Sequence, residues 1–414
     1  MQFCLNEKKL DNANKPHTVW CDNDEKKSIE LREQVNRMYF NHRISKNTIA
    51  GDKGVSKKFV IQWTQSPNQD FSADMRGWTK GVRRKWGPFI EETICYIHSH
   101  LTRDPHQFFT GATAVVQEWR ARYPQSTIPP LRTIGKIMSD LGLTARKTRF
   151  HRKGASRYLC YPEHTVYNHI WKRVLEADFI GKKYITGRTE PINFIGFSFK
   201  KEPRLRYFKR IEGQTAVNFI QACSSFFERF EQPDCIKIDN ALATIGSASG
   251  KRNISKTMNF LLKNHIYPIF AVPRKPFSQA SIEGNNSVFS RKFWNCISFS
   301  SLEEIDEKLE WFNEASLRYT GYHPYHHQKS SEFLPRVYFI RQVQEHQATH
   351  DGYIDVLNEK VVLPYSYINY FVLAEWDITK EQPFVYFEKD QQLEMIEQAV
   401  FLINENSKKT LNRW

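Results

Sequence analysis

The sequence lacks the marks of several protein classes. Its seven cysteines are scattered and none forms a C-x-x-C pair, so neither a disulfide framework nor a zinc ribbon is predicted. It contains no run of about 18 apolar residues, the length that a membrane helix needs. The phosphate-binding pattern G-x-x-x-x-G-K-[ST] is also missing, which excludes a P-loop ATPase. Because its first residues include no apolar signal segment, we expect a cytoplasmic chain with reduced thiols and no membrane contact.

Apolar and aromatic residues are plentiful. Hydrophobic residues make up 40% of the 414 residues, and aromatic residues make up 14%. A chain of this composition can bury enough surface to offset the entropy of folding, so wholesale disorder is excluded. At about 150 residues per domain, the length predicts two to four domains.

Positive charge is concentrated in the first part of the chain. The formal net charge is +15, from 60 Lys and Arg against 45 Asp and Glu. Residues 1–163 carry a net +12, residues 164–316 a net +6 and residues 317–414 a net −3. A basic N-terminal third is typical of nucleic-acid binding, and a merely soluble basic surface is the alternative.

A helix-turn-helix pattern lies within residues 1–70. A helix is predicted from Ser28, as its N-cap, to about residue 41; a short helix then ends near residue 50, Gly54 makes a turn, and Ser56 caps another helix. In a DNA-binding unit this last helix enters the major groove. An ordinary three-helix bundle is the alternative. The residues expected to face DNA are Lys57, Lys58 and Gln62.

A second helical unit is predicted for residues 88–163, after a linker at 71–87. Its helices cover 89–101, 112–122 and 131–141, and a basic arm follows them. The inner face of the third helix is expected to carry Leu131, Ile134, Ile137, Met138 and Leu141. The residues expected to contact DNA are Arg132, Thr133 and Lys136 on its outer face and Arg146, Lys147 and Arg149 in the arm.

Residues 164–320 change to an alternation of strands and helices. Three predicted strands are followed by helix, strand, helix, strand and helix, which favours a mixed five-stranded sheet with flanking helices. A linker is predicted at 321–350. Residues 351–414 are predicted to form a small β-barrel-like domain with a helix at 391–404.

Three carboxylates stand out in the α/β region. Between residues 235 and 302 there are nine Lys and Arg but only two acids, Asp239 at the end of a buried strand and Glu283 on a helix. Asp178 lies in the first strand, and Glu176, on the same strand face, is its rival. Converging carboxylates among basic and amide groups would suit Mg²⁺. Two such ions can promote in-line phosphoryl transfer.

These residues resemble the DDE transposase/integrase superfamily of the bacterial insertion-sequence type. The resemblance rests on Asp178, the pair Asp239-Asn240, and Glu283 with the small residues that precede it, and it covers roughly residues 165–320. The segment 319–325 is similar to the family's Tyr/His-Pro segment. A longer spacing between the second and third acids departs from the family pattern.

The resemblance implies a fold, an activity and partners. The core would be RNase-H-like, with Asp178, Asp239 and Glu283 as catalytic residues that hold two Mg²⁺ or Mn²⁺ ions. The protein would bind double-stranded DNA at element ends, nick it and join the freed 3′-hydroxyl to target DNA, as a homo-oligomer in the nucleoid; an accessory ATPase is left open. Core residues expected to contact DNA are Asn240, Asn286, Arg291 and Lys292.

Other functions stay open from the sequence. A domesticated, inactive transposase could act as a sequence-specific DNA-binding regulator. A general RNase-H-like nuclease or resolvase would leave two end-recognition units unexplained. A retroviral-type integrase is disfavoured because no His-His-Cys-Cys zinc module is visible.

Overall fold

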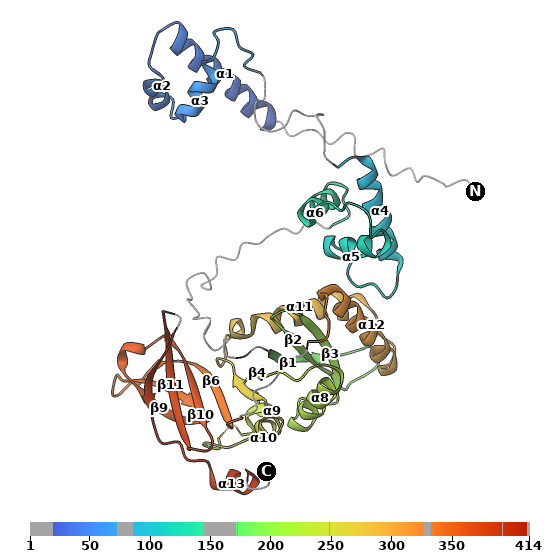
Figure 1. The fold of residues 1–414 in the computed structure, drawn as a ribbon, viewed down its shortest axis with the longest axis vertical. Helices are drawn as coiled ribbons and strands as arrows, with labels where there is room; N and C mark the ends of the chain where they lie inside the picture. Colours follow the sequence, from blue (N-terminus) through green and yellow to red (C-terminus); the bar gives the residue numbers. More distant parts are fainter. Residues whose placement is uncertain are drawn as a thin grey trace, which may run out of the picture. The chain divides into compact units, whose positions relative to one another are not determined.

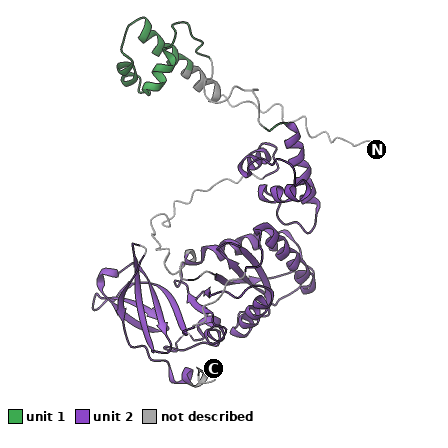
Figure 2. Ribbon diagram, in the orientation of Figure 1, with its two compact units in different colours: residues 1–87 green, residues 88–414 purple. Residues whose placement is uncertain are grey.

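The computed structural model describes residues 20–72, 86–144, 171, 173–247, 249–325, 333–390 and 392–411. The chain forms two compact units, residues 1–87 and residues 88–414 (Figure 2). No described helix combines the length and apolar character that crossing a bilayer requires.

The described residues of the first unit form three helices around a small core. They are α1 (Trp20–Phe40), α2 (Lys46–Asp52) and α3 (Lys57–Trp63). The Ser45 and Ser56 hydroxyls accept hydrogen bonds from the first turns of α2 and α3, as N-caps do. Gly54 makes the turn between them at φ +61°, where glycine avoids the steric cost. The predicted N-cap Ser28 is wrong, because α1 begins earlier, at Trp20.

The core of this unit explains the order of its helices. Val35, Ile49, Val60 and Trp63 are buried together. The expected recognition helix therefore packs its apolar face on α1 and α2, leaving Lys57 and Lys58 exposed. The helix, turn and helix lie where the sequence predicts them; their binding of DNA stays a prediction.

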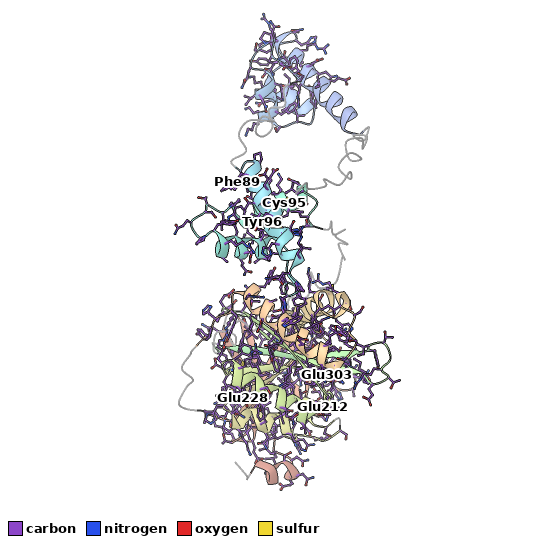
Figure 3. All side chains as sticks on the ribbon, turned by 90° about the vertical axis from the view of Figure 1, so that its right-hand side faces the viewer. Phe89, Cys95, Tyr96, Glu212, Glu228 and Glu303 are labelled. Carbon is purple, nitrogen blue, oxygen red and sulfur yellow. The ribbon has the colours of Figure 1, made fainter. Side chains whose placement is uncertain are left out.

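The second unit begins with three more helices, α4 (Pro88–Arg103), α5 (Ala112–Arg122) and α6 (Leu131–Asp140) (Figure 1). Ile134 and Met138 of α6 are buried as expected, but Leu131 and Leu141 are wrong as core positions, being 51% and 39% exposed. Leu131 is the first residue of α6 and Leu141 is its C-cap, so both stand at ends of the helix. Phe89 and Tyr96 of α4 are also exposed (Figure 3).

These helices are not separate from the α/β region. Phe109, in the loop before α5, stacks on Tyr319 with ring centroids 4.4 Å apart, and the Gln117 amide donates to the carbonyl oxygens of Arg318 and Tyr319. Both partners of Gln117 belong to α12 (Leu302–Thr320). One apolar cluster runs through α4–α6 and this side of the sheet.

A nine-stranded mixed sheet forms the centre of the second unit, in the order β12-β11-β10-β6-β5-β4-β1-β2-β3. Strands β1, β2 and β3 pair antiparallel, while β4 and β5 continue parallel to β1. The order β3-β2-β1-β4-β5 is consistent with the expected RNase-H-like core. The strands are β1 (Val174–Lys183), β2 (Ile192–Phe199), β3 (Leu205–Ile211), β4 (Cys235–Ile238) and β5 (Tyr267–Phe270).

Helices cover both faces of these five strands. One apolar cluster joins the sheet to α8 and α10, and another joins it to α11 and α12. At the edge, the buried Asn313 side chain of α12 pairs with the backbone N–H and C=O of Phe208 on β3. The helices are α8 (Ala216–Arg229), α9 (Leu242–Ile245), α10 (Lys256–Lys263) and α11 (Ala280–Lys292), with 3-10 turns η2 (Pro276–Gln279) and η3 (Trp294–Cys296).

The C-terminal part extends the same sheet. Strand β6 (Arg336–Gln342) pairs parallel with β5, and β10 to β12 follow antiparallel. A second sheet has the order β7-β8-β9. The remaining elements are β7 (Gln344–Glu345), β8 (Gly352–Val356), β9 (Glu359–Leu363), η4 (Tyr365–Tyr367), β10 (Phe371–Asp377), β11 (Gln382–Lys389), β12 (Gln392–Gln398) and α13 (Glu405–Leu411).

Three expectations change here. The predicted linker at 321–350 is wrong, because β6 and β7 lie in it and β6 is buried on both faces between β5 and β10. The predicted helix at 391–404 is also wrong: pairing with β11 makes a strand of a Gln- and Glu-rich segment whose local propensity favours a helix. A separate barrel is not confirmed, since β10 to β12 continue the core sheet.

Candidate active site

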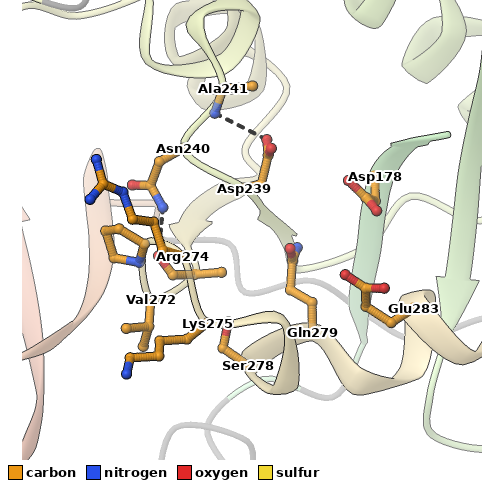
Figure 4. Close-up of a pocket in the computed structure, with 12 residues that line it drawn as sticks. Asp178, Asp239, Asn240, Ala241, Val272, Arg274, Lys275, Ser278, Gln279 and Glu283 are labelled. Carbon is orange, nitrogen blue, oxygen red and sulfur yellow. Dashed lines mark hydrogen bonds between the residues drawn. The ribbon is translucent and has the colours of Figure 1, made fainter. Parts of the chain in front are cut away.

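Asp178, Asp239 and Glu283 line one cleft, although they come from three different elements (Figure 4). Asp178 lies within β1, and Asp239 follows the last residue of β4. Glu283 lies in the first turn of α11, exposed, next to the buried Ile282. Because β1 and β4 are parallel neighbours and α11 packs on β1 and β2, the fold brings the three carboxylates together.

The cleft is open and has walls of mixed charge. Its volume is about 440 Å³. Behind Asp239 the chain turns into α9, and opposite it runs the segment from Ala271 to Lys275 that connects β5 to η2. Arg274 and Lys275 therefore border a space that holds three carboxylates.

Electrostatics make the negative charge of Asp178 unfavourable. Burial raises the pKa of its carboxyl, and the nearby charges of Asp239 and Glu283 raise it further, to about 7. Burial also raises the pKa of Asp239. A cation between these groups would relieve this repulsion.

Hydrogen bonds hold two of the carboxylates. The Asn286 amide, one turn after Glu283 on α11, donates to Asp178 Oδ2 at 2.9 Å. Asp239 Oδ1 accepts from the backbone N–H of Ala241 at 3.2 Å. Gly196, the β2 partner of Asp178, makes room for Asn286, because a Cβ there would lie 2.9 Å from Asn286 Oδ1.

The cleft contains a set of oxygen donors but not an already formed metal cage. In the described parts of the chain, no group of three or more His, Cys, Asp or Glu side chains is gathered closely enough to hold an ion. The donors are carboxylate and amide oxygens, which hard cations such as Mg²⁺ and Mn²⁺ prefer. Asn286 Oδ1 is buried with no hydrogen-bond partner.

Glu176, the rival for the first position, is used elsewhere. Its carboxylate accepts the backbone N–H of Ile282 at 2.9 Å, and it pairs in register with Lys237 of β4. The Lys237 amine donates to the carbonyl of Ser278. Glu176 does not line the cleft; its hydrogen bond holds the start of α11, so Asp178 is the acid of β1 that faces the cleft.

The predicted DNA-contacting residues fall into different places. Asn240 lines the cleft, but its side-chain NH2 and its side-chain oxygen both form hydrogen bonds within the protein. The Asn286 side chain donates a hydrogen bond to Asp178. Residues that lie exposed are Lys57, Lys58, Arg132, Lys136, Arg291 and Lys292, whereas Gln62 and Thr133 are half-buried. Arg146, Lys147 and Arg149 lie outside the described residues.

Sequence reasoning missed Arg274 and Lys275 as residues of the cleft. Both belong to the basic stretch between residues 235 and 302, but charge alone does not say which of its nine cations approach the acids. Pro273 and Pro276, on either side of them, were the available signal, since they indicate a loop after a buried strand.

Comparison with known proteins finds two groups of weakly similar solved structures. No protein family and no curated protein matches its sequence. One similar solved structure is the catalytic core domain of BIV integrase, with 13% identity and a TM-score of 0.24; the match covers 35% of this chain and 80% of that one. Another is a simian T-cell lymphotropic virus intasome in complex with PP2A regulatory subunit B56 gamma, with 11% identity and a TM-score of 0.30; the match covers 75% of this chain and 98% of that one. A third is the Mos1 transposase paired-end complex with left transposon end, with 11% identity and a TM-score of 0.26; the match covers 71% of this chain and 93% of that one. Because these TM-scores are low, the function proposed next rests on the residues of this chain.

Proposed function

We propose that this chain is a DNA transposase of the DDE type, which cuts the 3′ ends of an element and joins them to target DNA. The observation that carries the proposal is the cleft itself, which Asp178, Asp239 and Glu283 line together with Arg274 and Lys275. Acids that hold a cation and bases that hold phosphate are what phosphodiester transfer needs.

The donor chemistry of the cleft fits Mg²⁺ or Mn²⁺. Asp178, Asp239 and Glu283 would hold two ions, which when bound activate the attacking oxygen and stabilise the leaving oxygen. Asn286 keeps Asp178 oriented, and Arg274 and Lys275 position the phosphodiester.

The reaction has two steps of the same kind. In the first, a water oxygen bonds to phosphorus, the bond from phosphorus to the 3′-oxygen breaks, and that oxygen leaves as a hydroxyl. In the second, this 3′-hydroxyl loses its proton, bonds to a phosphorus of target DNA and displaces a 3′-oxygen there, which takes up a proton and leaves as a hydroxyl. No covalent intermediate with the protein forms.

The exposed basic residues would bind the DNA outside the cleft. Lys57 and Lys58 on α3, and Arg132 and Lys136 on α6, are exposed and would contact the element ends. Arg291 and Lys292, exposed in the last turn of α11, would contact the DNA as well. Assembly of several copies on DNA belongs to the same proposal.

The test is Glu283→Gln, assayed on plasmid DNA carrying the segments that flank the gene, with Mg²⁺ or Mn²⁺. We expect nicking and strand joining to disappear while binding of the end segments, followed by gel shift, stays unchanged. Glu307→Gln, an exposed glutamate of α12 away from the cleft, is the matched control. Full activity of the Glu283 variant would reject the assignment, and wild-type binding without metal-dependent nicking would favour a DNA-binding regulator.

A further inference from the structure

A buried arginine connects the C-terminal part of the sheet to the cleft. Arg341 lies on β6 and is only 6% exposed. Its described hydrogen-bond acceptors are all uncharged oxygens, one an amide oxygen and the others backbone carbonyls. Burial lowers the pKa of its guanidinium to about 10. Burying such a cation is costly, so its hydrogen bonds need an explanation.

Two of these acceptors belong to walls of the cleft. Arg341 Nη2 donates to Asn240 Oδ1 at 2.9 Å, and Nη1 donates to the carbonyl of Ala271 at 3.1 Å. Asn240 directly follows Asp239, and Ala271 begins the wall that continues to Lys275. The Asn240 amide in turn donates to the Ala271 carbonyl at 2.7 Å. The guanidinium and this amide therefore tie the ends of β4 and β5 to each other.

The remaining acceptors fix the arginine in the C-terminal part. Arg341 Nε donates to the carbonyl of Asp355 on β8 at 2.8 Å, and Nη1 also donates to the carbonyl of Ile340. The guanidinium carbon of Arg341 lies 5.1 Å from the ring centroid of Phe339, a residue of the same strand. One guanidinium thus joins β6, the second sheet and both cleft segments.

We infer that Arg341 is a positioning residue of the active site, through which the C-terminal part of the sheet holds Asp239 and the Ala271–Lys275 wall in place. The inference rests on the proposed function for its catalytic consequence. Its structural content, that Arg341 orders residues 239–245 and 271–275, can be measured without any reaction.

Four variants distinguish the local role of Arg341 from a general effect on folding. Arg341→Met removes all its hydrogen bonds, and Arg341→Lys keeps the charge but loses the planar fork. Asn240→Ala removes only the bond from Arg341 to Asn240 and the bond from Asn240 to Ala271, so it serves where Arg341→Met fails to fold. Arg336→Met is the matched control: Arg336 lies on the same strand but pairs with Glu375, 3.2 Å away.

Amide hydrogen exchange of the full-length chain decides the structural part. We expect residues 239–245 and 271–275 to exchange about tenfold faster in the Arg341 and Asn240 variants, the ratio that loss of one charge-assisted hydrogen bond produces. The Arg336 variant should leave both segments unchanged. Unchanged exchange in Arg341→Lys and Asn240→Ala, or an equal increase over the whole second unit, would overturn the inference.

Plasmid nicking decides the catalytic part. We expect kcat to fall about 10- to 100-fold, as for residues that orient metal ligands, with KM for DNA unchanged. The double variant Arg341→Lys/Asn240→Ala should be slowed by less than the product of the two single effects, because the single variants share the contact between Arg341 and Asn240. Normal kcat in the variants would reject the catalytic role; no nicking by the wild type would instead reject the proposed function, and the exchange result would still stand.

Discussion

Two carboxylates on β1, two residues apart and on the same face of the sheet, lie in opposite surroundings. Glu176 is buried, accepts a backbone hydrogen bond from Ile282 and pairs in register with Lys237. Asp178 borders the cleft, where Asp239 and Glu283 repel its charge. A carboxylate beside a cation and an N–H donor is already satisfied, whereas one crowded by like charges can take up a cation. The difference separates a structural acid from a candidate ligand.

The largest expected difference between the two acids is in DNA cleavage. Asp178→Asn should lower the rate of metal-dependent nicking by about 1,000-fold, since several kcal/mol of transition-state stabilisation would be lost. Glu176→Gln keeps an acceptor for the Ile282 N–H, so its rate should fall by about tenfold or less. Single-turnover nicking measures both. Equal losses in the two variants would erase the distinction between the acids.

The free energy of unfolding of the metal-free chain should change in opposite directions in the Asp178 and Glu176 variants. The pKa of the Asp178 carboxyl is 3.8 in the unfolded chain and about 7 in the folded chain. Between these pH values the folded chain binds a proton that the unfolded chain does not bind. The stability that this proton contributes is therefore lost as the pH rises through about 7. Asp178→Asn should therefore stabilise the metal-free chain at pH 8 by about 2–4 kcal/mol. Glu176→Gln should destabilise it by about 1–3 kcal/mol, because the buried Lys237 loses the opposite charge near it.

Urea unfolding with a chelator present, from pH 5 to pH 8, tests both changes. The advantage of Asp178→Asn over the wild type should shrink as the pH falls below 7, since the wild-type carboxyl is then protonated. A variant that destabilises the chain at pH 8 would contradict the described repulsion.

The smallest expected effect is thermal stabilisation by Mn²⁺. A cation bound only to the folded chain, at about 100 times its Kd, adds about 2.7 kcal/mol. The melting temperature of the wild type and of Glu176→Gln should rise in Mn²⁺, and that of Asp178→Asn should not. Differential scanning fluorimetry with Mn²⁺ and with chelator gives the comparison. Stabilisation of all three to the same extent would place the ion elsewhere.

Local patterns predicted much of the fold. Helix α5 has the predicted limits, and Ser56 caps a helix after the Gly54 turn as predicted, because caps and turns depend on neighbouring residues alone. The strand β12 was predicted as a helix because its pairing with β11 is a contact between segments, which local propensity does not register.

The candidate site was predictable in its acids and less so in its surroundings. An acid at the end of a buried strand, and another on a helix in a basic stretch, suffice to select Asp239 and Glu283. Arg274, Lys275 and Arg341 could not be selected in this way, because their distance from the acids depends on how β5 and β6 are placed in the sheet.

The sequence by itself determined the distribution of charge, the limits of most helices and the short list of acids, since these follow from residue types and their spacing. Only the tertiary structure decided between Glu176 and Asp178, because strand alternation places both on one face and their partners come from β4 and α11. It also decided that β6 is part of the core sheet and that Arg341 reaches Asn240, 101 residues away in the chain. Pairing of distant segments is set by the packing of the whole sheet, and no local window of residues contains it.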